Sequence, residues 1–300
     1  MAGTQNSGST LLDTILGNAP GVWSLGEVGG FHRYTSEPSC DCGEPPASCA
    51  PCRAVLASLD KSGDVETLDR LGPLPLKERR AHWAVAGSRA RAEYARVADI
   101  AFAAVAAETG SSVLVDSSKN VARAAALVHD SRYDVRVLHL VRDGRGYLAS
   151  RRRRAPMTGR RYVAPVVMAG WLSKNLFISA VLRRQIPTGH YLLCRYEDFV
   201  SDPVGELRRI GAFAGVDTTG LAASAMSEGL ERHHLFEPRR RANYHVVRID
   251  TERLPGQRLP VMRNLVYWLG GGFISARWGY DRRQSYLDHV AGHRTATVGD

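Results

Sequence analysis

The sequence predicts an α/β protein: a P-loop-type parallel sheet flanked by helices on both faces, in a single domain covering residues 1–300. Three short apolar segments alternate with helical patterns, and a glycine-rich segment near the start precedes an apolar helical pattern. Strands that are apolar almost throughout are buried on both faces, and such strands alternating with helices form parallel sheets. A glycine-rich turn that opens a helix belongs to the same class of fold.

The expected elements follow from these patterns. We expect strands at 112–115, 135–141 and 190–194, and helices at 119–130, 163–184 and 204–215. An Ala-rich stretch from Lys77 to Glu108 predicts one long helix or a broken pair. Its Trp83, Tyr94 and Phe102 are expected to pack in the core, with the lining of a substrate cavity as the alternative. Residues 60–76 and 237–262 are rich in Pro, Gly and charge and are expected to be loops, and residues 285–300 a frayed tail.

The glycine-rich segment runs from Gly3 to Thr10 and has the pattern G-x-x-x-x-G-S-T. Backbone amides at a helix N-terminus, with the hydroxyls of Ser7, Ser9 and Thr10, can hold an anionic group. Ser9 stands where nucleoside triphosphatases carry a lysine for the β- and γ-phosphates. The loop therefore predicts a nucleotide with a 5′-phosphate-like end, and a flexible terminus is the alternative. Only Met1 and Ala2 precede Gly3, so either the first strand is a stub or the true start lies upstream.

The charge is strongly basic, with a formal net charge of +10, and 40 − 4 = 36 of the Lys and Arg residues are arginine. Arginine binds phosphate and sulfate through a two-pronged fork. Nucleic acid is the obvious alternative partner, but the aromatics are not interleaved with the basic runs and no nucleic-acid-binding motif occurs, so we expect none. No apolar stretch of the ~18 residues needed to span a bilayer is evident, and we expect a cytoplasmic protein without membrane insertion.

Four of the five cysteines, Cys40, Cys42, Cys49 and Cys52, fall in one Pro-rich stretch. Four thiolates can enclose a structural zinc ion, although this spacing is not that of a standard zinc ribbon. A surface loop of reduced or facultatively paired thiols is the alternative, and the sequence leaves the choice open. Cys194 lies in an apolar run and is expected to be buried.

Polar residues follow two of the predicted strands. Asp116-Ser117-Ser118-Lys119-Asn120 opens a helix, for which Ser117 or Ser118 is the expected cap and Lys119 lies in the first turn. An anionic ligand would offset the unfavourable position of that cation at a helix N-terminus. Arg142 ends the next strand and Ser150 follows eight residues later, so the two can grip a second phosphate. A surface ion pair between Arg142 and Asp143 is the alternative.

Taken together, Ser7-Gly8-Ser9-Thr10, Asp116-Ser117-Ser118-Lys119 and the run Leu140 to Ser150 resemble the signature of sulfotransferases that use 3′-phosphoadenosine 5′-phosphosulfate (PAPS). Three further matches follow in family order. They are Ser24-Leu25-Gly26-Glu27, the segment Tyr196 to Pro203, and Arg277-Trp278-Gly279-Tyr280.

The resemblance implies transfer of a sulfuryl group from PAPS, as co-substrate, to a hydroxyl or amine of a small-molecule acceptor, with no metal required. The donor-binding residues would be Gln5, Asn6, Ser7, Gly8, Ser9 and Thr10 around the phosphosulfate, Arg142 and Ser150 on the 3′-phosphate, and Arg240 closing over the nucleotide. Lys119 would stabilise charge on the transferring group. The acceptor and the oligomeric state are not predicted.

Glu27 is the predicted general base, because related enzymes use a glutamate after the first helix; His32 is the reserve candidate, and His139 is expected to be structural. The chain departs from the family at Asn6, where Arg or Lys is usual, and Lys119 is the natural replacement for that cation. Two alternatives stay open. One is a phosphotransferase of the same fold, for which Asp116 is the sole candidate Mg²⁺ ligand, and the other is a catalytically degenerate nucleotide-binding protein.

Overall fold

The computed structural model describes residues 1–28, 40, 44–45, 47–67, 89–158, 161–231, 246–250 and 261–280. The strands are β1 Ala2–Gly3, β2 Val22–Gly26, β3 Val113–Asp116, β4 Val137–Val141, β5 Tyr191–Arg195, β6 Leu230–Glu231 and β7 Val246–Val247. The helices are α1 Ser9–Gly17, α2 Ala50–Lys61, α5 Arg89–Thr109, α6 Val121–Asp130, α7 Gly144–Thr158, α8 Ala164–Phe177, the π-helix η3 Ile178–Leu182, α9 Arg183–Gln185, α10 Tyr196–Ser201, α11 Pro203–Ala214, α12 Leu221–Ser227, α13 Val261–Leu269 and the 3₁₀ helix η5 Gly272–Trp278.

The strands confirm the predicted α/β class with a parallel sheet. One sheet has the order β1-β4-β5, and β2 pairs with β3 in a second; every pair in these two sheets is parallel. A single parallel bridge between Ala2 and Lys119 connects β1 to the segment after β3. Beyond the two residues of β1, a cavity of about 580 Å³ lies between β3 and β4. The short pair β6 and β7 is antiparallel.

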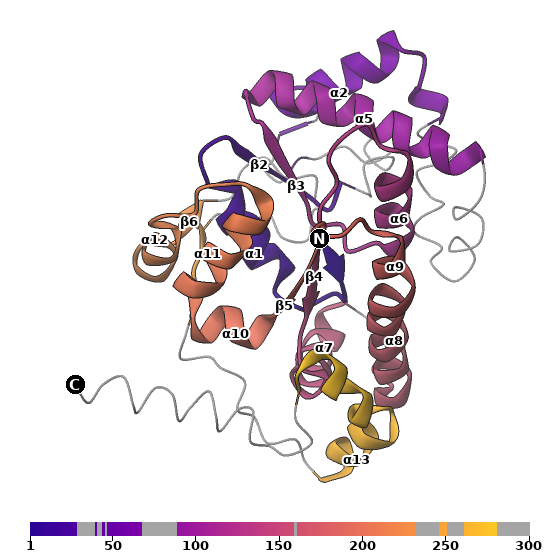
Figure 1. Ribbon diagram of the computed structural model, residues 1–300, viewed down its shortest axis with the longest axis vertical. Helices are drawn as coiled ribbons and strands as arrows, with labels where there is room; N and C mark the ends of the chain where they lie inside the picture. Colours follow the sequence, from indigo (N-terminus) through magenta and orange to yellow (C-terminus); the bar gives the residue numbers. More distant parts are fainter. Residues whose placement is uncertain are drawn as a thin grey trace.

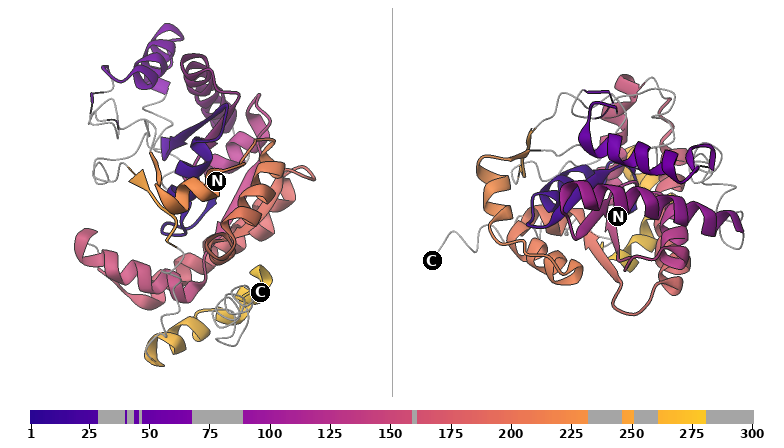
Figure 2. Two further views of the ribbon diagram at one scale, coloured as in Figure 1. Left: turned by 90° about the vertical axis from the view of Figure 1, so that its left-hand side faces the viewer. Right: turned by 90° about the horizontal axis from the view of Figure 1, so that it is seen from above.

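Helices lie on both sides of the sheets. Figure 1 shows α6, α8 and α9 along one side and α1, α11 and α12 along the other, with α2 lying on α5 at one end. The two further views in Figure 2 show the strands between these helices. Because every connection between the parallel strands contains a helix, both faces of the sheet are covered.

The core follows from the helical spacing of the apolar residues. Leu12, Ile15 and Leu16 of α1 recur at the interval that places them on one face, and all three are buried against Leu140 of β4 and Leu207 of α11. Burying an aliphatic side chain of this size contributes about 1.5–3 kcal/mol. This packing fixes the start of α1, and hence the glycine-rich loop, against the end of β4.

The predicted elements agree with the observed ones to within a few residues for β3, β4, β5, α6, α11 and the helix that begins at α8. The predicted loops are partly wrong, because α2 extends to Lys61 and the segment 237–262 contains β7 and the start of α13. The Ala-rich stretch holds α5, in which Tyr94 and Phe102 are buried as expected. Trp83 and the tail 285–300 lie outside the described residues.

The expectation that no segment is long and apolar enough to span a membrane is wrong for one helix. The continuous helical run Ala164–Gln185 has 22 residues and a mean hydropathy of 1.4 over its most apolar part. Its buried residues Met168, Trp171, Asn175, Ile178 and Leu182 recur every three or four positions. A core-facing helix of a soluble protein passes the same test, so one such helix is weak evidence, and the cytoplasmic location stays a prediction.

Candidate functional site

The glycine-rich loop joins β1 to α1 and depends on its glycines sterically. Gly8 has φ 91°, and a Cβ atom there would lie 2.3 Å from a ring carbon of Tyr196. Gly3 has φ 153°, and its Cβ would lie 2.4 Å from the carbonyl oxygen of Leu140. Both backbone conformations strongly favour glycine. Asn6, the residue that departs from the family pattern, also has a positive φ of 63°, which asparagine tolerates better than most residues.

The loop presents backbone amides at the start of α1. Ser7 is fully buried, and its hydroxyl donates to the carbonyl of Thr4 over 2.7 Å, so this side chain braces the loop from inside. No described side chain caps α1, and its first turn contains no acidic residue. Since the first four amides of a helix lack intrahelical partners, this N-terminus suits an anion.

Two arginines face the loop. The Nη1 atom of Arg142 donates to the carbonyl of Asn6 over 3.1 Å, and its guanidinium stacks 4.5 Å from the centre of the Tyr196 ring. The Nη1 atom of Arg151 lies 3.4 Å from Oε1 of Gln5. The buried Nε atoms of both arginines have no hydrogen-bond partner among the described residues. A buried donor without a partner is costly, and an anionic ligand on the loop would satisfy it.

Ser150, predicted to bind the second phosphate together with Arg142, follows that arginine closely in the chain. The turn after β4 leads into α7, and Ser150 lies in the second turn of that helix with 6% of its surface exposed. The predicted alternative, a pair between Arg142 and Asp143, is wrong. Asp143 instead pairs with Arg145, whose Nη2 atom lies 2.6 Å from Oδ2. Arg142 therefore contacts the loop and Tyr196 rather than Asp143.

Lys119 and Glu27 form an ion pair at the ends of β3 and β2. The Nζ atom of Lys119 lies 2.6 Å from Oε1 of Glu27, and the side chains are 4% and 26% exposed. The predicted capping is wrong: Asn120 caps α6, its side chain accepting from the amide of Arg123, so Lys119 precedes the helix. Lys119 has φ 58° and bridges Ala2 of β1, which places its backbone beside the start of the glycine-rich loop.

Asp116, the candidate Mg²⁺ ligand, is engaged by Arg123. Nε of Arg123 lies 2.6 Å from Oδ2 of Asp116, while Nη1 donates to the hydroxyl of Tyr94 over 2.6 Å. The other oxygen of Asp116 accepts from the amide of Ser118. Burial, the largest single influence, raises the pKa of Asp116, but the positive charges of Arg123 and of the chain's N-terminus, together with the hydrogen bonds to the carboxylate, outweigh burial and hold the pKa below its usual value. Asp116 is thus part of a neutralised structural pair.

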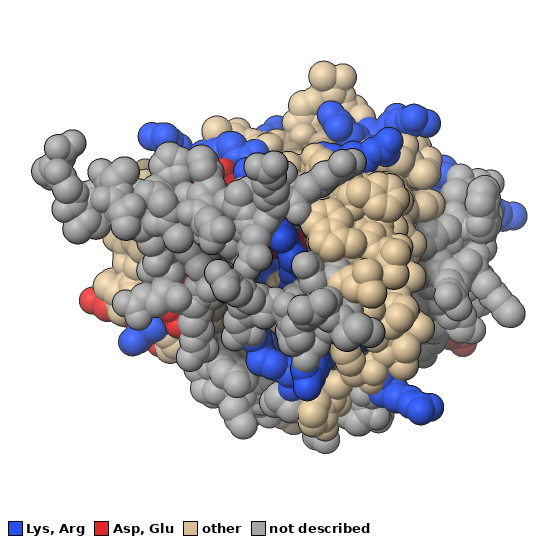
Figure 3. Space-filling model, turned by 90° about the horizontal axis from the view of Figure 1, so that it is seen from below, with Lys and Arg blue, Asp and Glu red and all other residues tan. Residues whose placement is uncertain are grey.

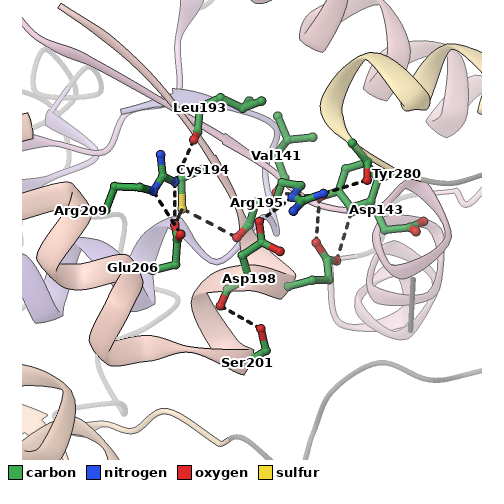
Figure 4. Close-up of polar contacts among 12 residues, drawn as sticks. Val141, Asp143, Leu193, Cys194, Arg195, Asp198, Ser201, Glu206, Arg209 and Tyr280 are labelled. Atoms are coloured by element: carbon green, nitrogen blue, oxygen red, sulfur yellow. Dashed lines mark hydrogen bonds and ion pairs between the residues drawn. The ribbon is translucent and has the colours of Figure 1, made fainter. Parts of the chain in front are cut away.

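A buried carboxylate joins the ends of β4 and β5. Glu197 accepts from the amide of Asp143 over 3.1 Å and from the hydroxyl of Tyr280 over 2.8 Å. Burial, together with the neighbouring charge of Asp143, raises the pKa of Glu197 to about 7. The hydroxyl of Tyr280 also lies 3.2 Å from the carbonyl of Val141, and Figure 4 shows Tyr280, Asp143 and Val141 converging at this point. The network holds the strand ends that carry Arg142 and Tyr196.

Among the described residues, Lys and Arg side chains outnumber acidic ones on the lower face of the molecule. Figure 3 shows them in the middle of this face and along its rim. Helix α7, which lies in the lower part of Figure 1, carries four consecutive arginines, Arg151 to Arg154, of which the last three are exposed. A face of this sign attracts anionic ligands.

The comparisons with known proteins agree with this geometry. A model of the "Sulfotransferase family" matches residues 1–220. This chain belongs to the sulfotransferase family. Its fold is similar to that of the "Sulfotransferase Domain from the Synechococcus PCC 7002 Olefin Synthase", with a TM-score of 0.53 and 19% identity over 94% of each chain. No protein of curated function matches the sequence significantly.

The structure brings several of the predicted residues of this sulfotransferase together. The loop Gln5 to Thr10 and Arg142 are in contact, and Lys119 contacts Glu27. Arg240 and His32 lie outside the described residues. His139 is buried between Tyr191 and Asn175, and burial lowers its pKa to about 4, which agrees with the structural role predicted for it.

Sequence reasoning missed Arg151, Tyr196 and Glu197 as residues around the loop. Tyr196 packs against both Gly8 and Arg142, and Arg151 reaches Gln5. Arg151 is the first of four consecutive arginines, and nothing in the sequence distinguishes it from the other three. Tyr196 and Glu197 stand directly after a predicted strand, where ligands bind in parallel sheets, and that position was the available signal.

Proposed function

We propose that this sulfotransferase moves a sulfuryl group from PAPS to a hydroxyl or amine of a small-molecule acceptor, without a metal ion. The observation that carries the proposal is the pair of buried Nε donors on Arg142 and Arg151, beside a helix N-terminus that no described side chain caps. Donors arranged in this way suit a ligand with two separate anionic groups. PAPS has such groups at its 5′ and 3′ positions.

The proposed donor site combines the loop and α7. Backbone amides of Gln5 to Thr10, including that of Ser7, and the hydroxyls of Ser9 and Thr10 would hold the 5′-phosphosulfate at the start of α1, while the Ser7 hydroxyl braces the loop through the carbonyl of Thr4. Arg142 and Ser150 would hold the 3′-phosphate, and Arg240 would close over the nucleotide. We add Arg151 to this set, because its guanidinium already contacts Gln5 of the loop.

The proposed chemistry uses the ion pair at the ends of β2 and β3. The acceptor oxygen or nitrogen attacks sulfur, the bond from sulfur to the phosphate oxygen breaks, and adenosine 3′,5′-bisphosphate leaves. Glu27 would take the acceptor proton, which requires its carboxylate to be oriented, and the ion pair with Lys119 at 2.6 Å would hold it in place. Lys119 would also bring positive charge next to the group in transfer, in place of the cation that Asn6 lacks.

The competing phosphotransferase function finds less support in the geometry. Such an enzyme needs a carboxylate for its Mg²⁺ ion, and Asp116 is the candidate that the sequence offers at a strand end. Both oxygens of Asp116 are engaged, one by Arg123 and one by the amide of Ser118. Freeing this carboxylate for a metal would leave the buried guanidinium of Arg123 without its counterion, which is costly.

Calorimetric titration in the absence of magnesium tests the donor site. We expect adenosine 3′,5′-bisphosphate to bind with micromolar affinity, and AMP and ATP to bind much more weakly. Equal binding of AMP and the bisphosphate would contradict the proposal, and tight magnesium-dependent binding of ATP would favour the phosphotransferase. Release of adenosine 3′,5′-bisphosphate from PAPS, stimulated by candidate acceptors, then separates an enzyme from a protein that binds nucleotide without turnover.

A further inference from the structure

We propose that Cys40, Cys49 and Cys52 bind a structural zinc ion. Their three sulfur atoms all lie within 4.8 Å of one another, and each residue is at most 3% exposed. In a tetrahedral zinc site with Zn–S bonds of about 2.3 Å, neighbouring sulfurs are roughly 3.8 Å apart. The described arrangement therefore needs only small side-chain movements to supply three of the four ligands of the ion.

Backbone hydrogen bonds tie two of the three cysteines to neighbouring positions. The amide of Cys40 donates to the carbonyl of Glu44 over 3.0 Å. The amide of Cys49 donates to the carbonyl of the next residue, Pro45, over 3.0 Å, directly before α2 begins. Cys40 and Cys49, nine positions apart in the sequence, are thus both anchored to the adjacent residues Glu44 and Pro45.

Helix α2 suits a cluster of thiolates. Cys49 is its N-cap, and Cys52 lies in its first turn, which contains no acidic residue. Zinc would displace one proton from each of the three thiols on binding. A single disulfide, by contrast, joins two sulfurs and leaves the third thiol buried beside it.

The three cysteines lie in a core between separate elements, so a metal ion bound there would stabilise the fold. The three cysteines pack with Leu25 and Val28 at the end of β2 and with Val55 of α2, in one apolar core that also contacts α5. A bound ion would tie Cys40 to Cys49 and Cys52 at the start of α2. The cysteines are independent of the proposed donor site, so the zinc proposal stands or falls separately from the proposed reaction. The fourth cysteine of the stretch, Cys42, lies outside the described residues.

Zinc content of the purified chain tests the proposal. We expect about one zinc per chain by mass spectrometry of the dialysed protein, lost in Cys52→Ser and Cys49→Ser and retained in Cys194→Ser. Cys194 is the matched control because it is equally buried but belongs to a different core. Zinc that persists in Cys52→Ser, or a wild-type chain without zinc whose three thiols are free or disulfide-bonded, would overturn the assignment.

A second measurement covers variants that fail to fold. Cobalt added to the wild-type chain after zinc removal should give the intense absorption of thiolate-to-cobalt charge transfer, with saturation at one equivalent. Chelator should lower the thermal midpoint of the wild-type chain and of Cys194→Ser by several degrees, because the folded state loses a ligand that the unfolded state does not bind as well. Cobalt spectra without thiolate bands, together with a midpoint that chelator does not change, would exclude the site.

Discussion

Lys119 and Glu27 are 92 positions apart in the sequence, yet Nζ of the lysine lies 2.6 Å from Oε1 of the glutamate. Their strands β3 and β2 are parallel neighbours, so their ends meet at one edge of the sheet. The ammonium is almost fully buried and the carboxylate is partly exposed. This asymmetry suits a carboxylate that can meet an acceptor while its counterion stays fixed.

Glu27→Gln tests the proposed base. The amide keeps the shape of the side chain but cannot accept a proton, so we expect turnover to fall about 10²- to 10⁴-fold. Binding of adenosine 3′,5′-bisphosphate should change little, because Glu27 is not among the proposed donor ligands. Initial rates with PAPS and calorimetry measure the two effects, and circular dichroism checks folding. If the variant turns over as fast as the wild type, another group must be the general base, and His32 would be the next residue to substitute.

Arg142→Ala tests the 3′-phosphate site. A hydrogen bond to a charged group contributes about 1.5–3 kcal/mol, which corresponds to roughly a 10- to 150-fold loss of affinity for adenosine 3′,5′-bisphosphate. Affinity for AMP should change less, so the preference for the bisphosphate should shrink. Arg208→Ala, an exposed arginine on α11, removes the same charge and should leave both affinities unchanged. If the preference survives in Arg142→Ala, that arginine does not hold the 3′-phosphate.

Gly8→Ala tests the packing of the loop on Tyr196. An alanine at φ 91° costs about 1–2 kcal/mol, and the clash of its Cβ with the tyrosine ring adds about 1–3 kcal/mol. Gly110→Ala is the matched control, because Gly110 has φ 67° and no atom within 4 Å of the added Cβ. Urea unfolding should show a larger loss of stability for Gly8→Ala than for the control, with loss of nucleotide binding in the first variant alone. Equal losses of stability in the two variants would mean that the loop can move away from the Tyr196 ring and so avoid the clash.

The buried Glu197 predicts a pH dependence of stability. Its pKa of about 7 lies above the usual 4.5, so between these values the folded chain holds a proton that the unfolded chain has released. Stability therefore falls as the pH rises through this window, by at most about 1.4 kcal/mol per pH unit from this group. Urea unfolding across the window should show a smaller fall in Glu197→Gln. Glu228→Gln, an exposed control, should keep the wild-type slope, and a wild-type slope in both variants would contradict the raised pKa.

Local patterns in the sequence were sufficient for the class of fold. The apolar strands at Val113–Asp116, Val137–Val141 and Tyr191–Arg195 are short, continuous and followed by polar residues, so their period and their ends can both be recognised. Helix α2 could not be found in this way, because its start lies in a stretch whose cysteines and prolines resemble a loop. Strand β2 was missed because its five residues follow α1 after a short turn with little contrast in composition.

The sequence by itself determined the glycine-rich loop, the order of the motifs and the residue types proposed to bind an anion, because these depend on neighbours a few positions apart. Tertiary structure decided which charges meet. Whether Arg142 pairs with Asp143 or faces Asn6, and whether Lys119 starts a helix or reaches Glu27, depends on the pairing of strands far apart in the chain. The same holds for the three buried thiols, which the sequence places up to twelve positions apart and the structure brings within 4.8 Å of one another. Charge–charge contacts depend steeply on distance, and a one-dimensional pattern does not contain that distance.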